Sequence, residues 1–191
     1  MKLTNKGEGG TMILYNNFYA GMIHLKNNEF ELARDFFQQI VDLEPDNAEA
    51  HAWLAATYGR LMEFGSMLEK MALLPIFEHE VATALELNSE LVLARQVNGL
   101  RLLLTPTDFG GDPEKAVREL EYAIKNGVCE CEVFYALGLA YLATRDEVRA
   151  ANAFAQALEC DPEYVQALHQ IEFLHKELPH KSFEFRDSRI Q

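Results

Sequence analysis

The residues best suited to chemistry in this chain are three cysteines. Cys129 and Cys131 are separated by one residue and could ligate a soft metal ion. A structural metal site needs further ligands at similar spacing, and neither a second Cys-x-x-Cys pair nor paired histidines lie close to them in the sequence. Free, buried thiols are therefore the favoured interpretation, and Cys160 is expected to pack inside the fold.

Histidines offer a second candidate for chemistry. His169, Glu172 and His175 recur every three residues near the C-terminus, so one helix face could bring them to a metal. An exposed polar edge explains the same spacing, and it is the preferred interpretation. His79, between two glutamates, is expected to be solvated. We predict no metal site.

Catalysis is not indicated by the remaining residues. The serines and histidines are scattered, with no nucleophile at a known spacing from a base. Gly110 and Gly111 could cradle an anion, but the Lys-Ser/Thr pair of a phosphate loop does not follow them. We therefore predict no enzymatic activity and no cofactor, and a structural loop in which Phe109 packs against the core.

The elements that position these residues are predicted to be paired helices. Residues 131–162 read as two short antiparallel helices, because apolar residues recur at helical spacing on both. Thr144 and Glu147 have the spacing of a capping box for the second helix. Asp161 and Pro162 suit the N-cap and first turn of a further helix.

This unit resembles the tetratricopeptide repeat (TPR), a helix pair of about 34 residues. The matching residues are Leu137, Gly138, Tyr141, Ala150, Phe154, Ala157 and Pro162. Aligning the small residue of each first helix gives Gly21, Ala55, Gly99 and Gly138, at separations of 34, 44 and 39 residues. The resemblance implies an all-α, right-handed TPR superhelix (an α-solenoid) of four helix pairs with a C-terminal capping helix.

We expect a single TPR domain over residues 13–178. Its repeats fall at about 14–47, 48–91, 92–130 and 131–164, followed by the capping helix over 163–178 with a stripe of Leu168, Ile171, Leu174 and Leu178. Residues 1–12 are expected to form a disordered lead and residues 179–191 a flexible tail.

The second repeat carries an apolar, Met-rich extension over residues 61–74. Its pattern predicts prolonged helical structure with a kink at Gly65 and Ser66, and Pro75 is expected to end it and open the next helix. The third repeat contains the loop TPTDFGGD, which is similar to one in a group of prokaryotic TPR proteins that share a TPxxFGGD loop.

In TPR proteins the first helices of stacked repeats line a concave groove, which is the usual binding surface. The resemblance implies such a partner-binding groove here, mostly apolar with aromatic anchors. The corresponding positions are Tyr15, Phe18, Met22, Trp53, Ala56, Leu93, Gln96, Leu100, Tyr135 and Leu139. The alternative for each position is packing between neighbouring repeats.

One class of TPR partner is excluded by these positions. Some TPR proteins hold the carboxylate of a chaperone tail with a Lys/Asn/Arg clamp. The corresponding residues here are Phe18, Met22, Trp53, Leu93 and Val97, and none of them can act as a clamp.

Composition and charge narrow the remaining functional classes. The chain has 191 residues, 49% of them hydrophobic, with a formal net charge of -13. So negative a chain is a poor match for nucleic acid or an anionic membrane, which both favour a basic face. The sequence has no signal-peptide pattern and no apolar run long enough to span a bilayer, and its few cysteines suit a reducing compartment. A cytoplasmic protein is therefore expected.

The leading functional hypothesis is a non-catalytic scaffold that binds a peptide or helix of a partner protein in its groove, with an acidic rim that selects basic flanks. A homodimer through the same surface is also considered. The alternative is a carrier of a small apolar or lipid-like ligand, held in a cavity walled by the extension of the second repeat.

Overall fold

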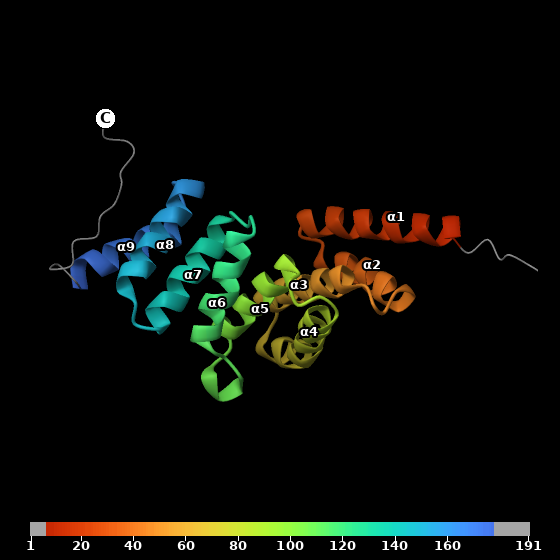
Figure 1. The fold of residues 1–191 in the computed structure, drawn as a ribbon, viewed down its shortest axis with the longest axis horizontal. Helices are drawn as coiled ribbons and strands as arrows, with labels where there is room; N and C mark the ends of the chain where they lie inside the picture. Colours follow the sequence, from red (N-terminus) through yellow and green to blue (C-terminus); the bar gives the residue numbers. More distant parts are fainter. Residues whose placement is uncertain (1–6, 178–191) are drawn as a thin grey trace, which may run out of the picture. The chain divides into compact units, whose positions relative to one another are not determined.

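The computed structural model describes residues 7–177, and every regular element in that range is helical. Four helix pairs are followed by one further helix (Figure 1), which confirms the predicted all-α solenoid architecture. The α-helices are α1 Gly7–Lys26, α2 Phe30–Leu43, α3 Ala48–Phe64, α4 Met67–Leu87, α5 Val92–Leu104, α6 Pro113–Lys125, α7 Cys131–Ala143, α8 Glu147–Cys160 and α9 Val165–Glu177, with a short 3-10 turn η1 over Thr107–Phe109.

The chain divides into two compact units, Met1–Val97 and Asn98–Gln191. The division falls within α5. In the first unit α2 packs against α1 and α3, and α4 packs against α3. In the second unit α6, α7, α8 and α9 pack in sequence, each against the next. A single domain over 13–178 stays a prediction.

The N-terminal segment differs in part from the predicted disordered lead. Helix α1 begins at Gly7, so residues 7–12 are helical and the prediction of a disordered lead over them is wrong. Residues 1–6 and the predicted tail at 179–191 lie outside the described residues.

Close approach of a first helix to its second helix is the main packing feature. A Cβ atom on Gly21 would lie 2.9 Å from Cζ of Phe37, and one on Gly99 would lie 2.8 Å from Cγ of Leu120. At Gly138 the ring of Phe154 leaves even less room for a side chain. Because these two rings and Leu120 are fully buried, each glycine admits the largest fully buried side chain of its repeat into the core.

The second repeat achieves its packing with longer helices. Helix α3 runs to Phe64, and after a break at Gly65 the hydroxyl of Ser66 accepts from the amide of Glu69 in a capping box that starts α4. The predicted helical extension is confirmed, with a break in place of a kink. The prediction that Pro75 opens the second helix is wrong, because Pro75 lies inside α4.

Buried polar contacts hold α3 against α4. Nδ1 of His51 lies 2.5 Å from Oε2 of Glu80, and both side chains are almost fully buried. Nε2 of the same imidazole lies 3.0 Å from the carbonyl oxygen of Pro45, which can only accept. Nε2 is therefore the donor, and a single proton joins Nδ1 to the carboxylate. No pattern in the sequence indicated this pair.

Helix termini in the fourth repeat are capped differently from the prediction. The N-cap of α8 is Asp146, whose carboxylate accepts from the amide of Arg149, while the hydroxyl of Thr144 donates to carbonyls at the end of α7. The predicted Thr144–Glu147 capping box is therefore wrong. Asp161 ends α8 and forms a turn with Glu163, so it does not directly start α9.

The loop of the third repeat is held by its own backbone. The amide of Gly111 donates to Pro106 and the amide of Asp112 donates to Leu102, and a Cβ atom on Gly111 would collide with the Thr105 carbonyl. Phe109 is 73% exposed, so the prediction that it packs against the core is wrong. Asp112 then caps α6, as its carboxylate accepts from the amide of Lys115.

Helix α9 covers the end of the fourth repeat. Ala167 and Leu174 are buried, and Ile171 is half-buried against the hydrophobic core of the second unit. This packing fits a capping helix. Leu168 of the predicted stripe is 39% exposed, and Leu178 lies outside the described residues.

Replacing a small residue at the helix contact should destabilise the second unit. We expect Gly138→Leu and Ala150→Leu each to lower the free energy of unfolding by about 1–3 kcal/mol or more, because both force bulk into a filled core. Ala143→Leu is the matched control, since Ala143 is exposed at the end of α7. Thermal unfolding of the three variants checks this, and equal midpoints would refute the packing scheme.

The buried pair offers a second stability test. His51→Ala or Glu80→Ala alone should cost about 3–5 kcal/mol, because each leaves its partner buried and unpaired. The double variant should lose clearly less than the sum of the two. Glu29→Ala removes a half-exposed partner of His24 and should cost about 0–1 kcal/mol. Denaturant unfolding measures all four, and strict additivity for the buried pair would contradict the coupling.

Candidate functional site

The predicted groove positions of the first unit gather on one hydrophobic cluster. The ring of Phe18 on α1 meets the buried ring of Phe37 on α2 edge-on, with ring centroids 5.9 Å apart. Trp53 on α3 stacks on the same Phe37 ring at 6.0 Å and meets Phe18 at 6.3 Å. Phe18 and Trp53 are half-buried, so each ring has one side on the core and part of its area open to solvent.

Three further groove positions border this cluster. Met22, Ala56 and Leu93 are half-buried and pack against the same core. Gln96 is half-buried on α5, while Tyr15 is 71% exposed. The chain therefore brings aromatic and aliphatic side chains of α1, α3 and α5 onto one core, and Tyr15 is the most exposed of the predicted set.

The second unit holds the remaining groove positions on its own core. Leu100, Tyr135 and Leu139 are half-buried and pack against the cluster of α6–α9. The ring of Tyr135 lies 5.6 Å from that of Phe154 and 5.5 Å from that of Tyr164.

Tyr164 was missed by the sequence analysis, although it contacts a predicted groove residue. It precedes α9 and is half-buried beside Tyr135. The signal available in the sequence was an aromatic residue two positions after Pro162, in the segment that leads into the capping helix. Tyr135 and Tyr164 together form the aromatic part of the candidate site in the second unit.

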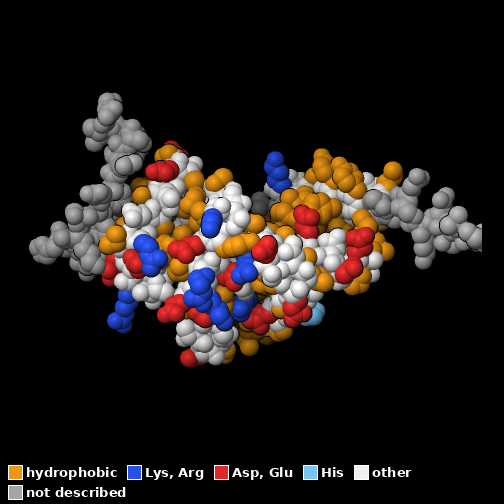
Figure 2. Space-filling view, viewed as in Figure 1, with side chains coloured by type: hydrophobic (Ala, Val, Ile, Leu, Met, Phe, Trp, Pro, Cys, Tyr) orange, Lys and Arg blue, Asp and Glu red, His pale blue; other side chains and the backbone are white. Residues whose placement is uncertain are grey.

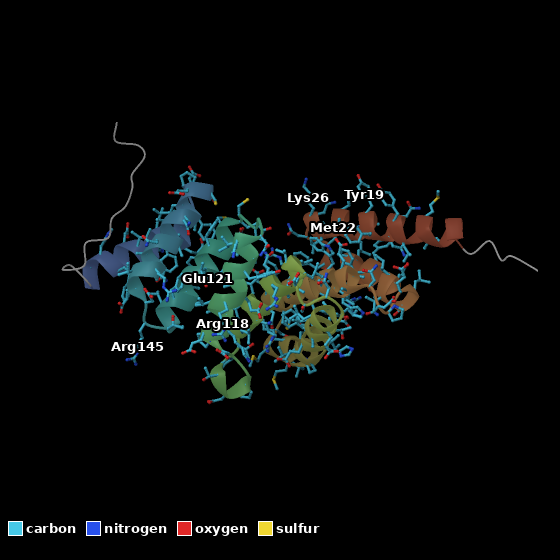
Figure 3. All side chains as sticks on the ribbon, in the orientation of Figure 1. Tyr19, Met22, Lys26, Arg118, Glu121 and Arg145 are labelled. Carbon is cyan, nitrogen blue, oxygen red and sulfur yellow. The ribbon has the colours of Figure 1, made fainter. Side chains whose placement is uncertain are left out.

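A polar network ties the second unit together beside these residues. The hydroxyl of Tyr141 donates to Oε1 of Glu121 on α6, and the guanidinium of Arg149 lies 4.6 Å from the Tyr141 ring centre. Burial, followed by the hydrogen bond to Glu121, raises the pKa of Tyr141 to about 12. Figure 3 shows Glu121 on α6 beside Arg118. This network fixes α6 against α7 and α8, and it is structural.

The cysteines show no arrangement suited to a metal. No group of three or more His, Cys, Asp or Glu side chains that could hold a metal ion occurs among the described residues. Cys129 and Cys160 are exposed and Cys131 is half-buried, so the expectation of buried thiols is wrong for the first two. Sγ of Cys160 donates to the Cys129 carbonyl at 3.4 Å, which joins the end of α8 to the loop before α7.

Two family models match separate parts of the chain. Residues 109–165 match a model described as tetratricopeptide repeat. Residues 16–100 match a model described as regulator of microtubule dynamics protein 1-3. A comparison with curated proteins found no match.

Solved structures of TPR proteins resemble the chain along most of its length. PilF from Pseudomonas aeruginosa is 19% identical, with a TM-score of 0.67 over 90% of this chain and 72% of that one. A TPR protein from Thermus thermophilus is 19% identical, with a TM-score of 0.61 over 82% of this chain and 78% of that one. MamA from Desulfovibrio magneticus is 15% identical, with a TM-score of 0.61 over 87% of this chain and 86% of that one.

The fold is that of a TPR solenoid. The TPR family model and these likenesses support the predicted repeat type, while the TPxxFGGD loop as a mark of a particular group stays a prediction. Among the helices in residues 7–177, none is long and apolar enough to cross a membrane.

Cys131 should react slowly with alkylating reagents. Burial, with a contribution from Glu132, raises the pKa of the Cys131 thiol to about 11, so little thiolate exists at pH 8. Its alkylation rate should rise about tenfold per pH unit until the pH reaches that value. Glu132→Gln should lower the pKa and speed the reaction. Mass spectrometry of iodoacetamide-treated peptides measures each site, and a rate at Cys131 that is flat with pH would contradict this.

Proposed function

We propose that this chain is a non-catalytic scaffold that binds a peptide or helix of a partner protein on the half-buried apolar side chains of its first helices. The observation that supports this most directly is the cluster of Phe18 and Trp53 on the buried ring of Phe37. Rings held in place by the core but open on one side lose little conformational freedom on binding, as interface anchors require.

The charge around these anchors favours a partner with basic flanks. Glu49 is exposed one turn before Trp53 on α3, and Glu132 is exposed one turn before Tyr135 on α7. In a helix, residues three or four apart share a face, so each aromatic anchor has a carboxylate beside it. Together with the net charge of -13, this arrangement would attract cationic side chains next to an apolar binding segment.

The match to a model described as a regulator of microtubule dynamics supports a protein as the class of partner. By its printed description, that family acts on a protein assembly. A cytoplasmic location would agree with such a partner.

A carrier of apolar ligands is supported less well. The extension of the second repeat would have to wall a cavity, but Phe64, Leu68 and Met71 are 69%, 78% and 64% exposed. Side chains so open to solvent do not line an interior cavity. An acyl-chain probe that bound these residues would nevertheless revive this alternative.

The test of the proposed function uses Trp53, the single tryptophan of the chain, as a reporter. Peptides selected on the immobilised protein by phage display should be apolar with basic flanks, and their titration should change the Trp53 emission saturably. Ala56→Arg places a charge beside the anchor rings and should weaken binding at least tenfold. Ile76→Arg is the control, because Ile76 lies on α4 and is 43% exposed.

Two outcomes would overturn the proposal. One is equal affinity of the Ala56→Arg and Ile76→Arg variants for a selected peptide. The other is selection of peptides that bind without any change in Trp53 emission. Glu49→Lys tests the charge argument separately, since it should weaken peptides with basic flanks and leave neutral ones unchanged.

A further inference from the structure

Helix α1 has two apolar faces, and only one of them is used by the fold. Leu14, Phe18, Gly21 and Leu25 recur every three or four residues, are buried or half-buried, and face the core with α2. A second set recurs at the same spacing, displaced along the helix. Its members are Met12, Tyr15, Tyr19 and Ile23, which are 66%, 71%, 62% and 41% exposed. We call this second set the outer stripe.

The outer stripe is visible on the surface of α1. Figure 2 shows hydrophobic side chains gathered over this helix with a basic side chain at one end. Figure 3 identifies that end as Lys26 and shows Tyr19 on the side of α1 that points away from α2. A contiguous apolar surface of this kind usually marks a binding site, whereas isolated apolar residues do not.

The stripe is also free of negative charge. Glu8 and Glu29 are successive acidic residues in the sequence, so residues 9–28 contain none, in a chain with 30 Asp and Glu. In a two-fold pair, charges of one sign near the symmetry axis repel their own copies, so a self-pairing face is favoured when it carries no excess of one sign there. The outer stripe meets this condition, which a strongly acidic face would not.

We infer that the outer stripe of α1 is a self-association surface, on which a second copy of the chain docks its own α1 in antiparallel orientation about a two-fold axis. Tyr19 lies midway between Met12 and Lys26 and would face Tyr19 of the second copy. Antiparallel pairing also places the negative end of each helix dipole beside the positive end of the other.

The size of the stripe is sufficient for a weak, specific dimer. Two tyrosines and two aliphatic side chains from each copy would bury on the order of 1,000 Å² in total, near the lower bound for a biological interface. The tyrosine hydroxyls can stay at the wet rim while the rings pack. We therefore expect a dimer that dissociates within the micromolar range.

The test is the molar mass of the 191-residue chain by sedimentation velocity, from low micromolar to submillimolar concentration. The wild-type chain should shift from monomer to dimer. Tyr19→Glu and Tyr19→Lys should each be monomeric throughout, because like charges would meet at the axis. An equimolar mixture of the two should dimerise again, since opposite charges then face each other. Ile13→Glu, 53% exposed on the same helix but off the stripe, is the control and should dimerise as wild type.

The outcomes separate a second copy from other occupants. A wild-type chain that stays monomeric, or a Tyr19 variant that dimerises like wild type, overturns the proposal. Failure of the mixture to dimerise overturns the two-fold arrangement centred on Tyr19.

Circular dichroism of each variant shows whether α1 remains folded. If Tyr19→Glu loses helicity, Tyr19→Ser replaces it, and dimerisation as strong as wild type again overturns the proposal. Peptide binding reported by Trp53 should be unchanged in Ile13→Glu and Tyr19→Glu, so this surface and the proposed peptide site can fail independently.

Discussion

The fold depends on one steric constraint. In each helix pair, a large side chain from the second helix packs against a residue without a side chain on the first helix. Phe37 occupies the space at Gly21, and Phe154 occupies the equivalent space at Gly138. Because both rings are fully buried, the two helices cannot separate without opening a cavity of aromatic size. The half-buried side chains of Phe18, Trp53 and Tyr135 pack against these same two rings, so the contact also fixes the predicted groove positions.

The second repeat satisfies the same constraint with different residues. Ala55 stands at the aligned position, and Phe77 instead approaches Gly59, one turn further along α3, where a Cβ atom would lie 3.7 Å from the ring. This looser contact is accompanied by longer helices and by the buried His51–Glu80 pair. Any other arrangement of α3 and α4 would leave one member of the pair buried without its partner, so the pair favours this arrangement.

Sequence patterns predicted the helix pairs because small and large residues alternate at fixed separations, and steric fit leaves few alternatives. Patterns predicted local details less well. Thr144 had the spacing of an N-cap, but Asp146 is closer to the first turn of α8 and its carboxylate accepts from the helix. Pro75 suggested a boundary, yet it removes only one helical hydrogen bond. Met71, whose carbonyl loses its amide donor, is 64% exposed, so water can reach that carbonyl. The groove positions could be placed on helices, but their burial depended on neighbours such as Tyr164 that no repeat pattern specified.

The first and last helices of the described residues, α1 and α9, expose different kinds of side chains on their outer surfaces. Helix α9 mixes exposed Phe173 with charged Glu172 and Lys176, which keeps its outer surface hydrated. Helix α1 has an uninterrupted apolar stripe and no acidic residue from Met12 to its end. Intrinsic helix formation does not require this difference, since polar residues would form the helix equally well. The apolar stripe instead adds exposed hydrophobic area that is unfavourable in water unless another surface covers it. The outer stripe of α1 therefore leaves apolar area that the proposed two-fold pairing with a second copy would cover.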